Sequence, residues 1–156
     1  MQLDVTNVGP NVQRIAVGPR GSPGQYPPNV FLITGDSRAV FVDTAYGKDD
    51  EVEAALGAWR AKGGLPVAAI VLSHRHEDHV GGAARLREAT GGDVVAAADE
   101  RDGIEKQSPG LRIARRTPLS EQTPLLGTGD VIHVPSPERG ARGARLQRDD
   151  GQGTTL

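Results

Sequence analysis

The sequence contains no cysteine, few aromatic residues, no excess of positive charge and no long apolar run. Without cysteine there is no disulfide framework and no thiolate chemistry, so any bound metal depends on histidine and carboxylate side chains. One tryptophan, two tyrosines and two phenylalanines leave the core to valine, leucine, isoleucine and alanine. The four histidines are therefore the residues that tell most about function.

Charge and hydropathy limit the partners and the location. The formal net charge is −2, which provides no positive field for a polyanion, so we expect no general binding of nucleic acid. No apolar run approaches the ~18 residues of a membrane span, and residues 1–6 lack the regions of a signal peptide. We expect a cytoplasmic protein without membrane contact that acts on a small-molecule substrate. The sequence does not indicate its oligomeric state.

The spacing of apolar residues predicts alternating strands and helices. Strands are expected at Val12–Val17, Val30–Thr34, Ala39–Val42, Val67–Leu72, Val94–Ala97 and Val131–Val134. Helices are expected from Asp50 to the glycines at 63 and 64, from about Val80 to the glycines at 91 and 92, and over Asp99–Lys106. Asp50 and Glu53 have the spacing of a capping box for the first helix.

The length and the composition of the last residues predict one domain and a tail. At 156 residues the chain has the size of a single domain, which we assign to residues 1–137. Residues 138–156 form a tail rich in arginine and glycine, in which Leu146 and Leu156 are the only large apolar side chains. We expect this tail to be disordered or loosely attached, since so little burial does not offset the entropy of ordering it.

A dense polar cluster follows the buried strand Val67–Leu72. His74, His76, Asp78 and His79 lie within six positions, together with Glu77. In an extended segment His74 and His76 point to the same side, and Asp78 and His79 fall where the chain turns into the next helix. Imidazole and carboxylate ligands suit zinc, and also iron or manganese. A solvated loop that complements a helix dipole is the simpler alternative, but sites gather at the ends of such strands.

This cluster resembles the signature of a known family. The pattern His74-x-His76-x-Asp78-His79, followed by glycines at 81 and 82, is similar to that of the metallo-β-lactamase fold hydrolases. Upstream, residues 41–44 (Phe-Val-Asp-Thr) resemble the family's strand-end aspartate motif. The resemblance implies an α/β (α+β) fold, an αββα sandwich, of which this chain covers mainly the N-terminal αβ half.

The resemblance also implies a mechanism. His74 and His76 would hold a first metal ion, and Asp78 and His79 a second, so that one or two zinc ions activate water. Asp78 would be catalytic, orienting the attacking hydroxide or accepting its proton. An ester, a thioester, a lactam or a phosphodiester is a compatible substrate. Asp43 would support the metal ligands, or it would be an ordinary turn or cap aspartate.

The chain departs from the family in its last third. The second half of the fold, with the remaining ligands, is largely missing, and no histidine follows His133. His133 is either an ordinary strand histidine or a substitute ligand. The tail resembles the product of a frame shift or a truncation. The alternative function is therefore a noncatalytic fragment or interaction module with an incomplete metal site.

Overall fold

The structure is a computed structural model that describes residues 3–18, 27–114, 131–133 and 147–149. Its strands are β1 (Leu3–Gly9), β2 (Val12–Val17), β3 (Asn29–Thr34), β4 (Ala39–Val42), β5 (Val67–Leu72), β6 (Asp93–Ala96), β7 (Val131–His133) and β8 (Gln147–Asp149). Its helices are α1 (Asp49–Ala61), α2 (Glu77–Val80), α3 (Ala83–Thr90) and α4 (Ala98–Gln107).

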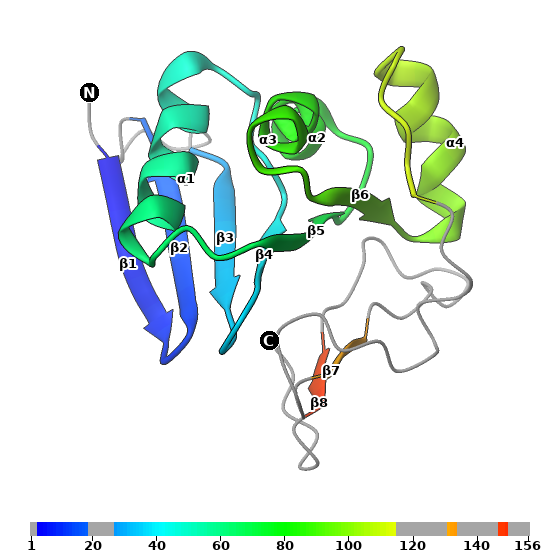
Figure 1. Ribbon diagram of the computed structural model, residues 1–156. Coiled ribbons are helices and arrows are strands. Elements are labelled where there is room, and N and C mark those ends of the chain that lie inside the picture. The colour runs from blue at the N-terminus through cyan, green and yellow to red at the C-terminus, as the bar shows by residue number, and fades with distance from the viewer. Residues whose placement is uncertain (1–2, 19–26, 115–130, 134–146, 150–156) are drawn as a thin grey trace.

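Strands β1 to β6 form one mixed sheet in the order of the sequence (Figure 1). β1 to β4 are antiparallel neighbours, whereas β4, β5 and β6 run parallel. Helix α1 connects β4 to β5, and α2 and α3 connect β5 to β6, as crossovers between parallel strands require. The carboxyl ends of β4, β5 and β6 therefore share one edge of the sheet, where ligand sites of open α/β sheets lie.

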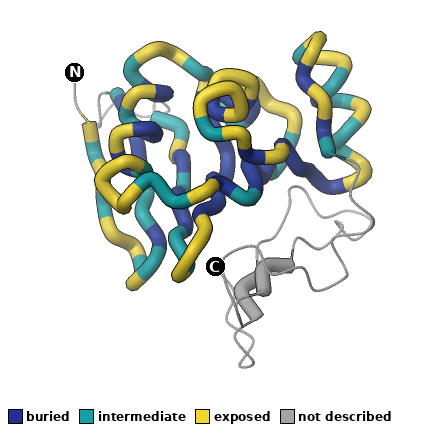
Figure 2. Tube along the Cα trace, in the orientation of Figure 1, coloured by how far each residue is buried: buried dark blue, intermediate teal, exposed yellow. Residues whose placement is uncertain are grey.

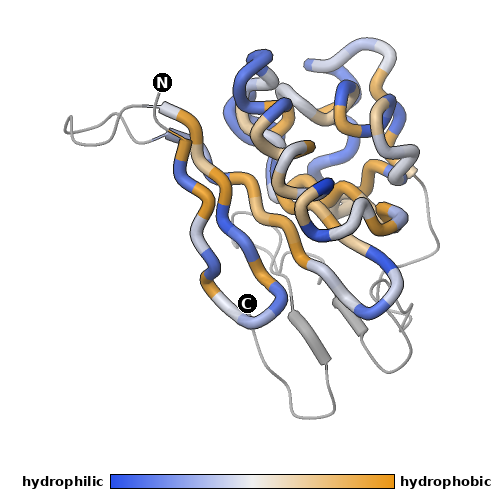
Figure 3. Tube along the Cα trace, turned by 60° about the vertical axis from the view of Figure 1, so that its left-hand side comes forward, coloured by the Kyte–Doolittle hydropathy of each residue, from blue (hydrophilic) through white to orange (hydrophobic). Residues whose placement is uncertain are grey.

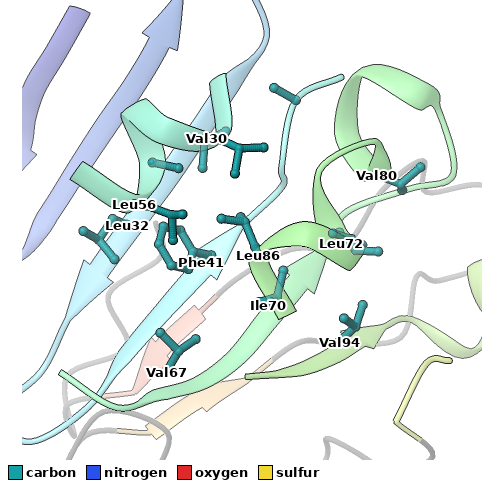
Figure 4. Close-up of a cluster of buried hydrophobic side chains, with 14 of the residues drawn as sticks. Val30, Leu32, Phe41, Leu56, Val67, Ile70, Leu72, Val80, Leu86 and Val94 are labelled. Atoms are coloured by element: carbon teal, nitrogen blue, oxygen red, sulfur yellow. The ribbon is translucent and has the colours of Figure 1, made fainter. Parts of the chain in front are cut away.

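Helices α1, α2 and α3 cover one face of this sheet (Figure 1). Phe41, Leu56 and Leu86 meet between β4, α1 and α3, and each is at most 4% exposed (Figure 4). The spacing of Val52, Ala55, Leu56 and Trp59 predicts the core face of α1: the first three are buried, and Trp59 is partly buried against the same cluster. This cluster fixes the helices against the strands whose ends carry the histidine motif, residues 74–79.

The opposite face of the sheet is also apolar and buried. Val40, Val42, Val71 and Val95 form a second cluster there, alternating along β4, β5 and β6 with the residues of the first. Figure 2 shows these three strands largely buried, whereas exposed residues lie on the helices, on β1 and at the turns. The apolar residues of β5 follow one another without alternation, as is typical of a strand that is covered on both faces.

Most of the predicted elements are confirmed. The boundaries of β2, β4 and β5 are those predicted, β3 and β7 differ by one residue at one end, and β6 and α4 differ by one residue at each end. The architecture is the predicted mixed α+β arrangement of a sheet with helices. No helix in the ranges that the structure describes is long and apolar enough to cross a membrane.

One strand was not predicted, and two expectations about local structure are wrong. β1 was not predicted; it pairs with β2, and its residues alternate in hydropathy along the edge of the sheet (Figure 3). The helix expected from Val80 is two helices, α2 and α3, so that Asp78 and His79 lie in a helical turn and not in a loop. The cap of α1 lies two residues earlier than expected: the Glu51 carboxylate accepts from the Lys48 N–H at 2.9 Å.

The division between a domain ending at residue 137 and a tail stays a prediction. Three tail residues, Gln147–Asp149, form β8, which pairs with β7 in antiparallel fashion. His133 stands opposite Gln147 in that pair. The rest of residues 138–156 lies outside the described residues. Whether His133 is an ordinary strand histidine or a substitute metal ligand therefore stays a prediction.

Candidate metal centre

The backbone turns sharply where β4 ends, at Asp43. The Asp43 N–H donates to the Val71 carbonyl at 2.8 Å, which continues the pairing of β4 with β5. Asp43 then adopts a φ of 58°, in the left-handed region, which aspartate tolerates better than most residues. This turn directs the Asp43 side chain toward the end of the neighbouring strand β5.

The Asp43 carboxylate joins three elements. Its Oδ1 accepts from the Ser73 N–H at 2.8 Å, and its Oδ2 accepts from the Ser73 hydroxyl at 2.7 Å. The same Oδ2 lies 2.7 Å from His79 Nδ1. Asp43 is only 7% exposed. The end of β4 is thus tied to the end of β5 and to α2, and Asp43 supports a predicted metal ligand, which makes it more than an ordinary turn aspartate.

The four predicted site residues come together at the end of β5. The ring centroids of His74 and His79 are 4.0 Å apart, and those of His74 and His76 are 4.6 Å apart. Asp78 Oδ2 lies 3.5 Å from His79 Nε2. Ser73, which sequence reasoning missed, has its hydroxyl 2.9 Å from His74 Nδ1. The signal for Ser73 is its place directly before the motif.

Helix α2 is held against the loop that follows β4. The Thr44 N–H and the Thr44 hydroxyl both donate to the His79 carbonyl, at 2.8 and 2.9 Å, and Thr44 Oγ1 accepts from the Gly82 N–H at 3.1 Å. The backbones of Gly81 and Tyr46 pack so closely that a Cβ on Gly81 would overlap the Tyr46 carbonyl. The two glycines after the motif therefore allow the chain that follows α2 to lie close to the loop after β4. Thr44, like Ser73, was not identified as a site residue.

The surroundings shift the pKa values of two histidines in opposite directions. The hydrogen bond to Asp43 raises the pKa of His79, against a smaller opposing effect of burial. Burial lowers the pKa of His74, and the neighbouring His79 and His76 lower it further. His74 is thus favoured in its neutral form, which is the form that binds metal. Because a carboxylate only accepts hydrogen bonds, Nδ1 of His79 carries its proton and Nε2 remains for a ligand.

The residues fit a metal ion by their chemistry. A histidine whose Nδ1–H donates to a carboxylate is the usual arrangement of a metal-binding imidazole, and His79 with Asp43 has it. Imidazole and carboxylate are zinc ligands. Yet in the described part of the chain no group of three or more histidine or acidic side chains is arranged so that it could hold a metal ion. The donors there have the chemistry of metal ligands without forming such a group.

An open hollow lies beside the motif. It has a volume of about 630 Å³ and is lined by Tyr46, His76, Glu77, Val80, Gly81, Gln107 and Ser108. The hollow joins the loop after β4, helix α2 and the end of α4. A molecule bound in it would lie against His76.

Comparison with known proteins agrees with this geometry. The family model described as the metallo-beta-lactamase superfamily matches residues 23–143, which is more than half of the chain. The chain belongs to the metallo-beta-lactamase superfamily. The match includes the histidine motif, Asp43 and Ser73.

The chain is also similar to curated proteins of this superfamily. It is 38% identical over 114 residues to a hydroxyacylglutathione hydrolase of Synechococcus sp., covering 71% of this chain and 40% of that protein. It is 35% identical over 121 residues to a hydroxyacylglutathione hydrolase of Pseudomonas entomophila, covering 64% of this chain and 44% of that protein. The chain thus spans about two fifths of the length of these relatives.

Solved structures confirm the fold. A metallo-beta-lactamase from Pontibacter korlensis superposes with a TM-score of 0.71 at 21% identity, over 94% of this chain and 67% of that one. A metallo-beta-lactamase from Pseudomonas aeruginosa in its mono-zinc form gives a TM-score of 0.66 at 23% identity, over 94% and 64%. At these identities the likeness concerns the fold, which is that of the superfamily.

Proposed function

We propose that this chain is a metal-dependent hydrolase of the metallo-beta-lactamase superfamily, with one or two zinc ions held by His74, His76, Asp78 and His79. The observation that carries the proposal is the hydrogen bond between Asp43 and Nδ1 of His79. This bond leaves the lone pair of Nε2 available to a metal ion, beside Asp78 and His74. Iron or manganese is compatible with the same donors. A zinc ion, when bound, supplies a Lewis acid and lowers the pKa of water from ~15.7 toward ~7.

The chain's own residues have separate roles in this proposal. Asp78 is the general base, which orients the attacking water and accepts its proton on a carboxylate oxygen. His74, neutral because its pKa is lowered, donates a lone pair without first losing a proton. Asp43 and Ser73 keep His79 and His74 in position. No protein nucleophile is required.

We propose a hydroxyacylglutathione thioester as the substrate. Four curated relatives carry the name hydroxyacylglutathione hydrolase, at 35 to 38% identity. The hollow beside His76 offers the ring of Tyr46, which is 44% exposed, together with the polar side chains of Gln107 and Ser108. These groups suit the amide and apolar parts of such a small molecule. A cytoplasmic location, without nucleic-acid or membrane partners, stays a prediction.

Hydrolysis by the zinc-loaded chain tests the proposal. We expect release of free thiol from a hydroxyacylglutathione thioester, at a rate that the Asp78→Ala variant lowers by about 10²-fold or more, as expected for loss of a general base. Glu88→Ala, an exposed acidic residue on α3, is the matched control and should hydrolyse like the wild type. Equal rates in all three proteins and in zinc buffer alone would contradict the proposal.

A noncatalytic fragment or interaction module is the second candidate. The observation that favours it is the absence, within the described ranges, of a three-donor group that could hold a metal ion. Such a protein would contain much less than one equivalent of zinc, iron or manganese after purification. Elemental analysis by mass spectrometry separates the two candidates, because the hydrolase requires near-stoichiometric metal.

A further inference from the structure

Helix α4 contacts the centre of the histidine motif through one carboxylate. The backbone N–H of Arg75, the residue between His74 and His76, donates to Glu100 Oε2 at 3.0 Å. The Arg75 Nε lies 3.8 Å from the same oxygen. The Glu100 side chain is 18% exposed and that of Arg75 is 52% exposed, so the contact is at the edge of the core.

The helix that carries Glu100 is firmly attached to the fold. Ile104, one turn further along α4, is fully buried and belongs to the main apolar cluster of the core. Gly103 faces Arg75, because a Cβ there would lie 2.9 Å from Arg75 Cδ. The Arg75 side chain therefore lies across α4, along the face that presents Glu100 and Gly103.

The segment between β5 and α2 is then held at three points. At its start the Ser73 N–H donates to Asp43, and at its end the His76 carbonyl accepts from the His79 N–H at 2.9 Å. Glu100 provides the hold between them, at the peptide that separates the first two histidines. A hydrogen bond to a charged acceptor is stronger than one to a neutral acceptor, so it restricts this segment well.

We propose that Glu100 is a positioning residue for metal binding by His74 and His76. The inference rests on the proposed function, since it assumes that these histidines bind metal. Glu100 does not touch the metal ligands' side chains; it fixes the backbone from which both project. Without the Glu100 carboxylate both imidazoles are still present, but the segment that carries them samples more conformations. Metal binding must then select the suitable ones.

The competing explanation is that Glu100 only stabilises the fold, and Glu105 supplies the matched control. Glu105 lies on the same helix, and its Oε1 accepts from the Ile113 backbone N–H at 3.1 Å. Glu105→Ala therefore removes the same kind of bond from α4, away from the motif. Glu100→Gln keeps an acceptor oxygen for the Arg75 N–H, and Arg75→Ala keeps the backbone bond while it removes the ion pair.

The experiment measures zinc affinity of the full 156-residue chain by competition with a chromophoric chelator, together with thermal unfolding of the metal-free proteins. We expect Glu100→Ala to weaken zinc binding about tenfold, at the lower end of the ~10 to 100-fold typical of residues that support ligands. We expect Glu100→Gln and Arg75→Ala to stay within about threefold of the wild type, and Glu105→Ala to bind zinc like the wild type although it unfolds earlier. With Co²⁺ in place of zinc, the visible absorption of Glu100→Ala should change and that of Glu105→Ala should not.

The outcomes separate the two proposals. Zinc binding by the wild type with equal affinities for Glu100→Ala and Glu105→Ala would overturn the positioning role and leave the proposed function standing. A wild type that binds neither Zn²⁺ nor Co²⁺ would overturn both. Weak binding by Glu100→Ala with recovery in Glu100→Gln supports the role of the acceptor oxygen.

Discussion

Replacement of Asp43 by asparagine changes the charge at the centre of the site while it preserves shape and backbone conformation. Asparagine, like aspartate, tolerates the φ of 58° at this position, whereas alanine adds a cost of about 1 to 2 kcal/mol in that region. The amide oxygen can still accept from the Ser73 N–H. The amide nitrogen then faces His79 Nδ1, to which the carboxylate had been an acceptor.

Two consequences follow for Asp43→Asn. The bond to His79 loses its charged acceptor, and since hydrogen bonds to charged groups are worth about 1.5 to 3 kcal/mol, we expect a loss of about 2 kcal/mol in the free energy of unfolding. At about 2 to 4 °C per kcal/mol for a chain of this size, the melting temperature should fall by about 4 to 8 °C. The amide also favours the His79 tautomer with its proton on Nε2, which removes the lone pair there. Zinc affinity should therefore fall by about 10 to 100-fold.

The assay combines thermal unfolding, chelator competition and ¹⁵N NMR of the imidazoles, which distinguishes the two tautomers. Ser73→Ala is the control, because it removes the contacts of the hydroxyl with Asp43 and His74 and leaves the bond between Asp43 and His79 intact. It should cost about 1 kcal/mol and leave the His79 tautomer unchanged. If Asp43→Asn kept the proton on Nδ1 and bound zinc like the wild type, the proposed role of Asp43 would be refuted.

The remaining predictions concern pH and packing. NMR titration of the metal-free chain should give His79 a pKa above 6.5 and His74 a pKa below it. Because the folded pKa of His79 is raised, the added stability from charged His79 beside Asp43 is fully present below the unfolded pKa and is lost as pH rises through the folded value. Equal melting-temperature losses for Asp43→Asn at pH 5.5 and 8.5 would contradict this. Gly81→Ala should lower the free energy of unfolding by about 1 to 3 kcal/mol, since the new methyl group meets backbone. Gly57→Ala, with nothing within 4 Å in helix α1, should stabilise by up to about 1 kcal/mol, and similar effects of the two substitutions would refute the packing argument.

The elements with strong local patterns could be predicted from the sequence. β5 is an unbroken apolar run, and α1 has a regular apolar spacing that ends at two glycines. The histidine motif is local as well, since six consecutive positions contain all four proposed ligands. β1 was missed because it is an edge strand with no buried residue: its apolar side chains Leu3, Val5 and Val8 are 55%, 41% and 52% exposed and add nothing to the core.

The contacts that support the motif could not be predicted, because they join distant positions. Asp43 meets Ser73 and His79 across 30 and 36 residues, and Glu100 meets Arg75 across 25. Only the pairing of β4 with β5, in which Val42 stands opposite Val71, brings Asp43 to the motif. The pattern of one segment does not contain that register, so Asp43 remained ambiguous and Ser73 and Glu100 were not identified.

Titration of the metal-free chain with Zn²⁺, followed by the imidazole NMR signals, tests the central claim most directly. We predict saturable changes in the signals of His74, His76 and His79 with one or two equivalents of zinc. In Asp43→Asn these changes should be absent at the same zinc concentration. Signals of these three histidines that stay unchanged, or that change without saturation, would contradict the assignment of the metal centre.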